Sequence, residues 1–234
     1  MPSPAIPQIA AKTLDAARGG LENAIADEGL RYAFYLLTQI ALASREEDWR
    51  TRLRELGLAL SERSTVFDLS AAFQNAVDDH LITHGWSSDI SEIAQRAAGD
   101  ALGTLAGPRA ETLFGNAGEE LRLAVRTLST KNGFATLGQH FFGHFLARFL
   151  NFYLSRATAA TSNRGPIEGI GDISQFNSDL VRHCEQSAAI VHDFAGEWYS
   201  KTEYQKGIDP QNAAGFVAIA VKKLQAELQG QRAA

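Results

Sequence analysis

Apolar residues recur at intervals of three and four from Ile9 almost to the end of the chain, and Ala and Leu are abundant. This spacing is typical of amphipathic helices. No stretch alternates β-branched apolar residues with polar ones for long enough to form a strand. The pattern therefore predicts an all-α fold: a single-domain helical bundle of about eight to nine helices around a central Phe-rich helix.

Capping patterns suggest where these helices begin. Ser44 with Glu47 forms a capping-box pattern, Ser88 precedes an apolar-periodic stretch, and Asp209 stands before Pro210 at the start of the last one. We expect helices near residues 9–26, 29–43, 46–60, 65–83, 88–105, 109–128, 133–156, 173–200 and 210–229.

Two segments lack the helical pattern. Three prolines fall within residues 1–8, and each fixes φ and lacks an N–H, so we expect a mobile N-terminal arm there. Residues 157–172 show no periodicity and predict a loop before the last two helices. Since two helices are too few for a core of their own, residues 9–234 are expected to form one all-α domain.

The most apolar helix spans residues 134–154, where aromatic and aliphatic side chains surround most of the circumference. Such a helix is buried. His140, His144, Arg148 and Asn151 nevertheless share one side of it. This polar strip is either an edge exposed to solvent, the commoner case, or the polar wall of an internal site. The phenylalanines favour core packing, with a pocket for an apolar ligand as the alternative.

Composition limits the classes of function. The chain has 234 residues, 45% of them hydrophobic, and a net charge of −5, which makes nucleic acid unlikely as the main ligand because such binding needs clustered Lys and Arg. The single cysteine, Cys184, excludes an internal disulfide and fits a reducing cytoplasm. No apolar stretch is both long and uninterrupted enough to span a membrane. We expect a soluble cytoplasmic protein.

Four of the six histidines form two pairs with i, i+4 spacing, His80 with His84 and His140 with His144. Each pair falls on one helical face, the arrangement of a two-histidine metal site. If the pairs converge, they could bind zinc or another divalent metal such as non-haem iron. The absence of a Glu-x-x-His pattern counts against iron. His84 has a second explanation, because Gly85 follows it and predicts a helix end.

A surface for a protein partner is the other candidate site. Trp49 lies among arginines and acidic residues, a pattern typical of a solvated face, although an exposed Trp can anchor an interface. The last helix has a wide apolar face that includes Phe216 and Leu224, which docks on the chain's own core or on a partner. With Arg148, these are the expected interaction residues.

Motifs that specify a reaction are missing. No glycine-rich phosphate-binding loop is present, and Cys184 falls on an apolar helix face, where a small buried hydrophobe is more common than a nucleophile. The leading interpretation is an interaction or structural subunit of a larger assembly, with a protein partner or a second copy of the chain. The alternative is a metal- or small-ligand-binding helical bundle, a hydrolase among the options, with a histidine-lined internal site.

Overall fold

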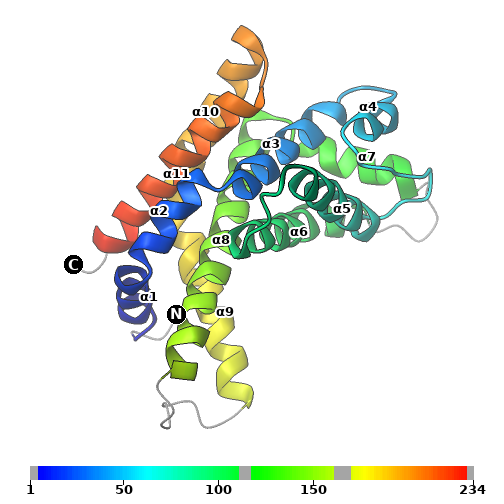
Figure 1. The fold of residues 1–234 in the computed structure, drawn as a ribbon. Coiled ribbons are helices and arrows are strands. Elements are labelled where there is room, and N and C mark those ends of the chain that lie inside the picture. Colours follow the sequence, from blue (N-terminus) through cyan, green and yellow to red (C-terminus); the bar gives the residue numbers. More distant parts are fainter. Residues whose placement is uncertain (1–4, 111–116, 161–169, 231–234) are drawn as a thin grey trace.

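A computed structural model describes residues 5–110, 117–160 and 170–230 of the chain (Figure 1). These ranges contain eleven α-helices and no strand. The all-α prediction is therefore confirmed, although the helices outnumber the eight to nine expected. The helices are α1 (Ala5–Ala16), α2 (Arg18–Ala26), α3 (Glu28–Ala43), α4 (Trp49–Glu55), α5 (Val66–His84), α6 (Asp89–Ala110), α7 (Ala117–Thr127), α8 (Lys131–Ala160), α9 (Ile170–Ser187), α10 (Ala189–Lys206) and α11 (Pro210–Gly230).

The larger number arises because two predicted helices are each divided. The stretch predicted at 9–26 breaks at Ala17 into α1 and α2, and the stretch predicted at 173–200 breaks at Ala188 into α9 and α10. Just before the second break, the Ser187 hydroxyl donates a hydrogen bond to the carbonyl of His183 at 3.0 Å. Such bonds compete with the backbone ladder and bend helices.

Residues 5–8, predicted to belong to a mobile N-terminal arm, are helical instead. Helix α1 already begins at Ala5, and Ile6 is buried against the core. Pro7 falls in the first turn, where its missing N–H would have no partner within the helix in any case. Residues 1–4 lie outside the described part of the chain.

The predicted helix at 46–60 is also wrong in extent, since α4 spans only Trp49–Glu55. Ser44 does not cap it. The Ser44 hydroxyl instead donates to the carbonyl of Ala41 at 2.7 Å, at the end of α3. Gly57 has a φ of 84°, a conformation that favours glycine, and ends the helical path soon after Glu55.

Other predicted helix starts are confirmed by hydrogen bonds. Ser88 accepts from the backbone N–H of Ser91 at 3.0 Å at the start of α6. Asp209 accepts from the N–H of Asn212 at 2.7 Å before α11. At the other end of α5, Gly85 takes a left-handed conformation with φ 69° and stops the helix after His84.

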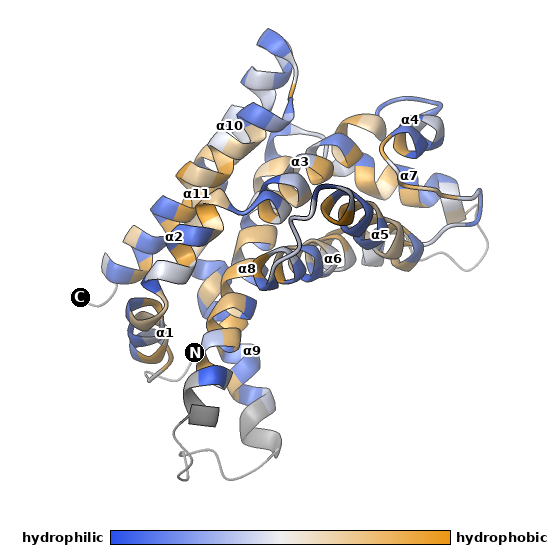
Figure 2. Ribbon diagram, viewed as in Figure 1, coloured by the Kyte–Doolittle hydropathy of each residue, from blue (hydrophilic) through white to orange (hydrophobic). Residues whose placement is uncertain are grey.

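The Phe-rich helix α8 lies at the centre of the fold and packs against α6, α9 and α10 (Figure 1). In Figure 2 the hydrophobic colour covers much of α8. Phe34 of α3 stacks on Phe216 of α11 at 4.8 Å between ring centroids and lies 5.6 Å from Phe142. The aromatic rings therefore fill this part of the core, as the packing interpretation predicted.

Glycines allow the neighbouring helices to approach α8 closely. A Cβ added at Gly143 would lie 2.9 Å from the Cα of Glu185 in α9, and one at Gly138 would lie 3.2 Å from the Cβ of Ala195 in α10. Real Cβ atoms are almost never found nearer than about 3 Å to another heavy atom, because the van der Waals repulsion is too strong. The backbones of α8 and α9 are therefore in near contact beside Glu185.

Helices α8 and α9 extend into the predicted loop at 157–172 from both sides, to Ala160 and from Ile170. Residues 161–169, the middle of that loop, lie outside the described part of the chain, as do residues 111–116 of the helix predicted at 109–128. Among the helices that the structure describes, none has a stretch long and apolar enough to cross a membrane.

Candidate metal centre

The polar strip of α8 faces the edges of two neighbouring helices. His140, His144 and Arg148 follow one another at intervals of four and therefore share one face of the helix. Their side chains are 24%, 14% and 37% exposed. The strip is thus neither fully buried nor an ordinary solvated edge, and it forms the wall of a partly enclosed site.

Helix α9 contributes a carboxylate to this site. Its close approach to Gly143 places Glu185 opposite the two histidines. The amide of Gln139 donates to the backbone carbonyl of Glu185 at 3.0 Å, which fixes α9 against α8 at this level. The position of the Glu185 side chain is therefore set by backbone packing and by a backbone contact.

Two histidines and one carboxylate converge at this point. The Nδ1 of His140 lies 3.0 Å from Oε1 of Glu185, and the Nε2 of His144 lies 3.5 Å from the same oxygen. One ligand atom from each of these three residues lies within 4.8 Å of the other two. Ligands of tetrahedral zinc are about 3.4 Å apart, given Zn–N bonds of about 2.1 Å. Small side-chain movements would therefore bring all three within bonding distance of one ion.

Helix α6 places a second carboxylate behind His144. The Nδ1 of His144 lies 3.9 Å from Oδ2 of Asp100, and the Nε of Arg148 donates to that same oxygen at 2.7 Å. In metal sites, a carboxylate beside the non-ligating nitrogen of a histidine orients the ring. Asp100 also neutralises Arg148, whose charge would otherwise oppose a cation at the histidines.

The protonation states in the site favour metal binding. The hydrogen bond from His140 lowers the pKa of Glu185, so this carboxylate is ionised near neutral pH. Burial is the largest influence on His144 and lowers its pKa, which favours the neutral imidazole that metals require. The Nε2 of His144 is buried and has no hydrogen-bond partner, although a buried polar atom normally has one.

The other histidine pair, His80 and His84, does not join this site, so the four histidines named as candidate metal ligands are not brought together. His80 stacks on Tyr32 of α3 with 3.7 Å between ring centroids, and His84 stacks on Trp86 at 4.5 Å. The Nδ1 of His84 bonds to the carbonyl of His80 at 2.7 Å, as expected for a residue at a helix end. The only His/Cys/Asp/Glu group with metal-site spacing in the described ranges is His140, His144 and Glu185.

The expected interaction residues are mostly inside the molecule. Trp49, Phe216 and Leu224 are each 2% exposed and belong to the hydrophobic core. Trp49 is therefore not on a solvated face, because α4 turns it towards the core. Arg148 pairs with Asp100 across α6 and α8. The burial of Trp49, Phe216 and Leu224 contradicts the predicted interaction surface at those three residues, whereas Cys184 is a buried small side chain as predicted.

The sequence pattern did not reveal two residues of this site, the candidate ligand Glu185 and the carboxylate Asp100 behind His144. Glu185 lies 45 positions from His140, and Asp100 lies 48 positions from Arg148. No local spacing connects residues on three different helices. The available signal was the polar strip itself, which predicts that something polar lies opposite it.

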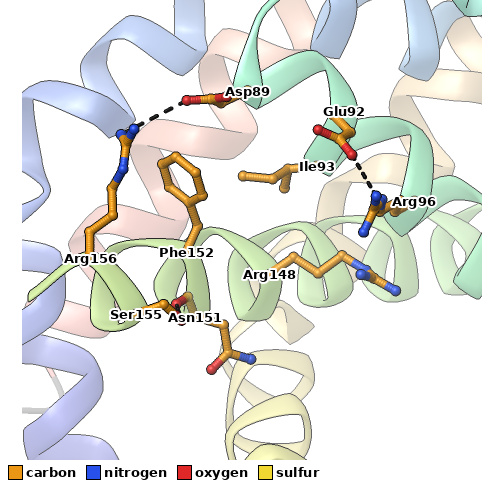
Figure 3. Close-up of a pocket in the computed structure, with 9 residues that line it drawn as sticks. All are labelled: Asp89, Glu92, Ile93, Arg96, Arg148, Asn151, Phe152, Ser155 and Arg156. Carbon is orange, nitrogen blue, oxygen red and sulfur yellow. Dashed lines mark hydrogen bonds and ion pairs between the residues drawn. The ribbon is translucent and has the colours of Figure 1, made fainter. Parts of the chain in front are cut away.

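A groove opens beside this candidate site, between α6 and α8 (Figure 3), with a volume of about 530 Å³. It is lined by Asp89, Glu92, Ile93, Arg96, Arg148, Asn151, Phe152, Ser155 and Arg156. Arg148 belongs to both regions, because it lines the groove and also binds Asp100 beside His144. The polar strip therefore runs from the histidines into the groove.

Comparisons of the chain with protein-family models, with curated proteins and with solved structures found no match. Fold and function are only loosely related, so the function of this protein has to follow from the chemistry of its site.

Proposed function

We propose that this protein binds one divalent transition-metal ion, with zinc as the first choice, through His140, His144 and Glu185. The observation that carries the proposal is the buried Nε2 of His144, which has no hydrogen bond and lies 3.5 Å from the Glu185 carboxylate. A neutral imidazole nitrogen without a hydrogen bond is an available ligand. The two-histidine, one-carboxylate set suits zinc and also non-haem iron.

The chemistry that such an ion supplies is the activation of water. Three protein ligands leave a coordination position open in a tetrahedral site, and a water there is acidic enough to lose a proton near neutral pH. The groove beside the site gives a substrate access. We therefore propose metal-assisted hydrolysis as the class of reaction.

The proposal is tested by metal analysis of the purified protein. We expect about one metal ion per chain, and loss of that ion in His144→Ala and in Glu185→Gln. The second histidine pair supplies a matched control, because His80→Ala and His84→Ala alter the same spacing on another helix and should leave the metal in place. A folded wild-type protein that takes up neither zinc nor iron after chelation would refute the proposal.

Cobalt substitution distinguishes a site from adventitious binding. Four-coordinate cobalt(II) absorbs visible light much more strongly than six-coordinate cobalt(II), because the tetrahedral field lacks a centre of symmetry. We expect the strong tetrahedral spectrum in the wild-type protein and its loss in Glu185→Gln. A six-coordinate spectrum that Glu185→Gln leaves unchanged would place the ion elsewhere.

A second proposed function is that of an interaction or structural subunit. Its support is a pair of exposed apolar residues four positions apart at the end of α5, Ile82 at 72% and Trp86 at 44% exposure. Apolar surface left exposed at one place on a protein often marks a protein contact. Light scattering over a range of concentrations should then detect an oligomer that Ile82→Ser with Trp86→Ser weakens. A strict monomer that recovers no partner from its native extract would count against this function.

A reducing compartment, the cytoplasm, is the proposed location. Cys184, the single cysteine of the chain, is a free and buried thiol. Cytoplasmic proteins keep their thiols reduced, whereas small secreted proteins usually rely on disulfides.

A further inference from the structure

The groove between α6 and α8 combines charge and an apolar surface. At about 530 Å³ it is within the usual range for small-molecule pockets. In Figure 3, the guanidinium groups of Arg96 and Arg148 lie at one end, Ile93 and Phe152 occupy the middle, and Arg156 with Asp89 closes the other end. Two cationic groups from facing helices therefore lie together at one end of an apolar floor.

Three arginines line the groove, and each is paired with one carboxylate. Arg96 pairs with Glu92, Arg148 with Asp100 and Arg156 with Asp89. The groove therefore has no excess of charge, and the recognition of an anion there depends on the hydrogen-bond donors of the arginines.

Each arginine is held from one side and keeps donors for another acceptor. Arg96 pairs with Glu92 on its own helix, and Arg148 pairs with Asp100 across the helices. A guanidinium carries several N–H groups in a planar fork, so these contacts leave further donors. The forked geometry matches the oxygens of a phosphate or a carboxylate.

The middle of the groove favours an aromatic or short apolar body. Phe152 is partly buried and packs against the core, and Ile93 is 8% exposed. Arg156 lies over the ring of Phe152 at 4.5 Å from its centroid, which holds the ring in place. A flat apolar group could pack on the exposed part of this ring.

We propose that the groove binds a small anionic ligand, whose phosphate or carboxylate contacts Arg96 and Arg148 while an aromatic or short apolar body packs on Phe152. Binding to the arginines does not require a metal. We further propose that this ligand is the substrate of the adjacent metal centre, a step that rests on the proposed function. Its support is Arg148, which lines the groove and is linked through Asp100 to His144.

The test is calorimetric titration of the metal-free protein with phenyl phosphate, phenylacetate and inorganic phosphate. We expect at least one of the two aromatic anions to bind. The dissociation constant of inorganic phosphate should be about tenfold higher than that of the tighter-binding aromatic anion. Tighter binding of phenyl phosphate than of phenylacetate identifies a phosphate ligand, and the reverse order identifies a carboxylate. Failure of all three compounds to bind overturns the inference.

Variants assign the binding to the groove. Arg96→Gln should weaken binding of the aromatic anion about tenfold or more, since the substitution removes a charge-assisted hydrogen bond. Phe152→Ala should remove the preference for phenyl phosphate over inorganic phosphate. Arg18→Gln is the matched control, because Arg18 is 57% exposed and Arg96 is 58% exposed, and both pair with an acid on the surface. Equal weakening in Arg18→Gln and Arg96→Gln overturns the inference.

The outcome is independent of the metal proposal. The titration uses metal-free protein, so a protein that never takes up zinc can still bind the anion. Conversely, a protein that binds zinc through His144 and ignores all three compounds would keep its metal centre and lose this inference.

Discussion

His144 has a carboxylate on each side of its ring. Glu185 lies near its Nε2 and Asp100 near its Nδ1. In such an arrangement one carboxylate shares the metal and the other orients the ligand. His144 therefore connects α8 with α6 and α9, and on the proposed function its two nitrogen atoms would have different roles.

Asp100→Asn tests the orienting role. An asparagine keeps the shape of the side chain and removes its charge, so we expect zinc affinity to fall by about 10- to 100-fold. Competition with a chromophoric chelator measures this change. Asp78→Asn is the control, since Asp78 also accepts a hydrogen bond between helices, from Gln95 at 2.7 Å. Unchanged affinity in Asp100→Asn would contradict the role assigned to Asp100.

His80 provides a pH prediction outside the metal centre. Burial, with His84 as the second influence, lowers its pKa below 6.5. The unfolded chain therefore takes up this proton at a higher pH than the folded chain, and His80 destabilises the fold as the pH falls below about 6.5. An NMR titration should give a midpoint below 6.5 for His80, and a higher one in His84→Ala. A midpoint at or above 6.5 in the wild-type protein would contradict this.

At the scale of helices, the contact between α8 and α9 determines where Glu185 lies. Gly143→Ala would place a Cβ 2.9 Å from both Cα and Cγ of Glu185, so α9 has to move. We expect a loss of about 1–3 kcal/mol in unfolding free energy, despite the better helix propensity of alanine, and weaker zinc binding. Urea denaturation and zinc titration measure the two effects.

Gly215→Ala in α11 is the matched control for this substitution. A Cβ added at Gly215 meets nothing within 4 Å, so only the helix propensity changes. We expect the unfolding free energy of that variant to rise by up to about 1 kcal/mol and its zinc affinity to stay unchanged. Similar stability changes in the two variants would show that the helix contact has no special role.

Helix boundaries were predictable where a cap acts within its own helix. Ser88 and Asp209 bond to backbone N–H groups three residues ahead, and sequence alone shows that spacing. Ser44 offered the same pattern but caps nothing ahead of it, because its hydroxyl bonds backwards to Ala41. The break at Ala188 has no glycine or proline to mark it and depends on local bending.

Two of the three residues of the candidate metal centre were predictable for the same reason. His140 and His144 share a helix, and helical geometry alone places them on one face. Glu185 comes from another helix, and its position depends on how closely α9 packs on α8, which is a property of the assembled core. The spacing of His80 and His84 is identical, yet their helix ends at the surface, so the spacing alone did not identify the site.

At the scale of the whole molecule, a metal ion would join helices that the chain otherwise holds by packing. The unfolded chain does not keep the three ligands together, so binding stabilises only the folded state. Zinc at a concentration 100 times its dissociation constant adds about 2.7 kcal/mol to the unfolding free energy. This gain raises the Tm of a protein of this size by about 5–11 °C. Differential scanning calorimetry with zinc and with chelator measures the shift, and an equal shift in His144→Ala would contradict the assignment.

The burial of the single thiol has a consequence for how motions of α9 can be observed. Cys184 precedes Glu185 in the sequence and is fully buried, and burial raises the pKa of its thiol well above the usual range. An alkylating reagent can therefore reach a reactive sulfur only while this part of α9 is detached from the core. The labelling rate of the native protein reports how often that detachment occurs, and an ion held by the neighbouring carboxylate would slow it.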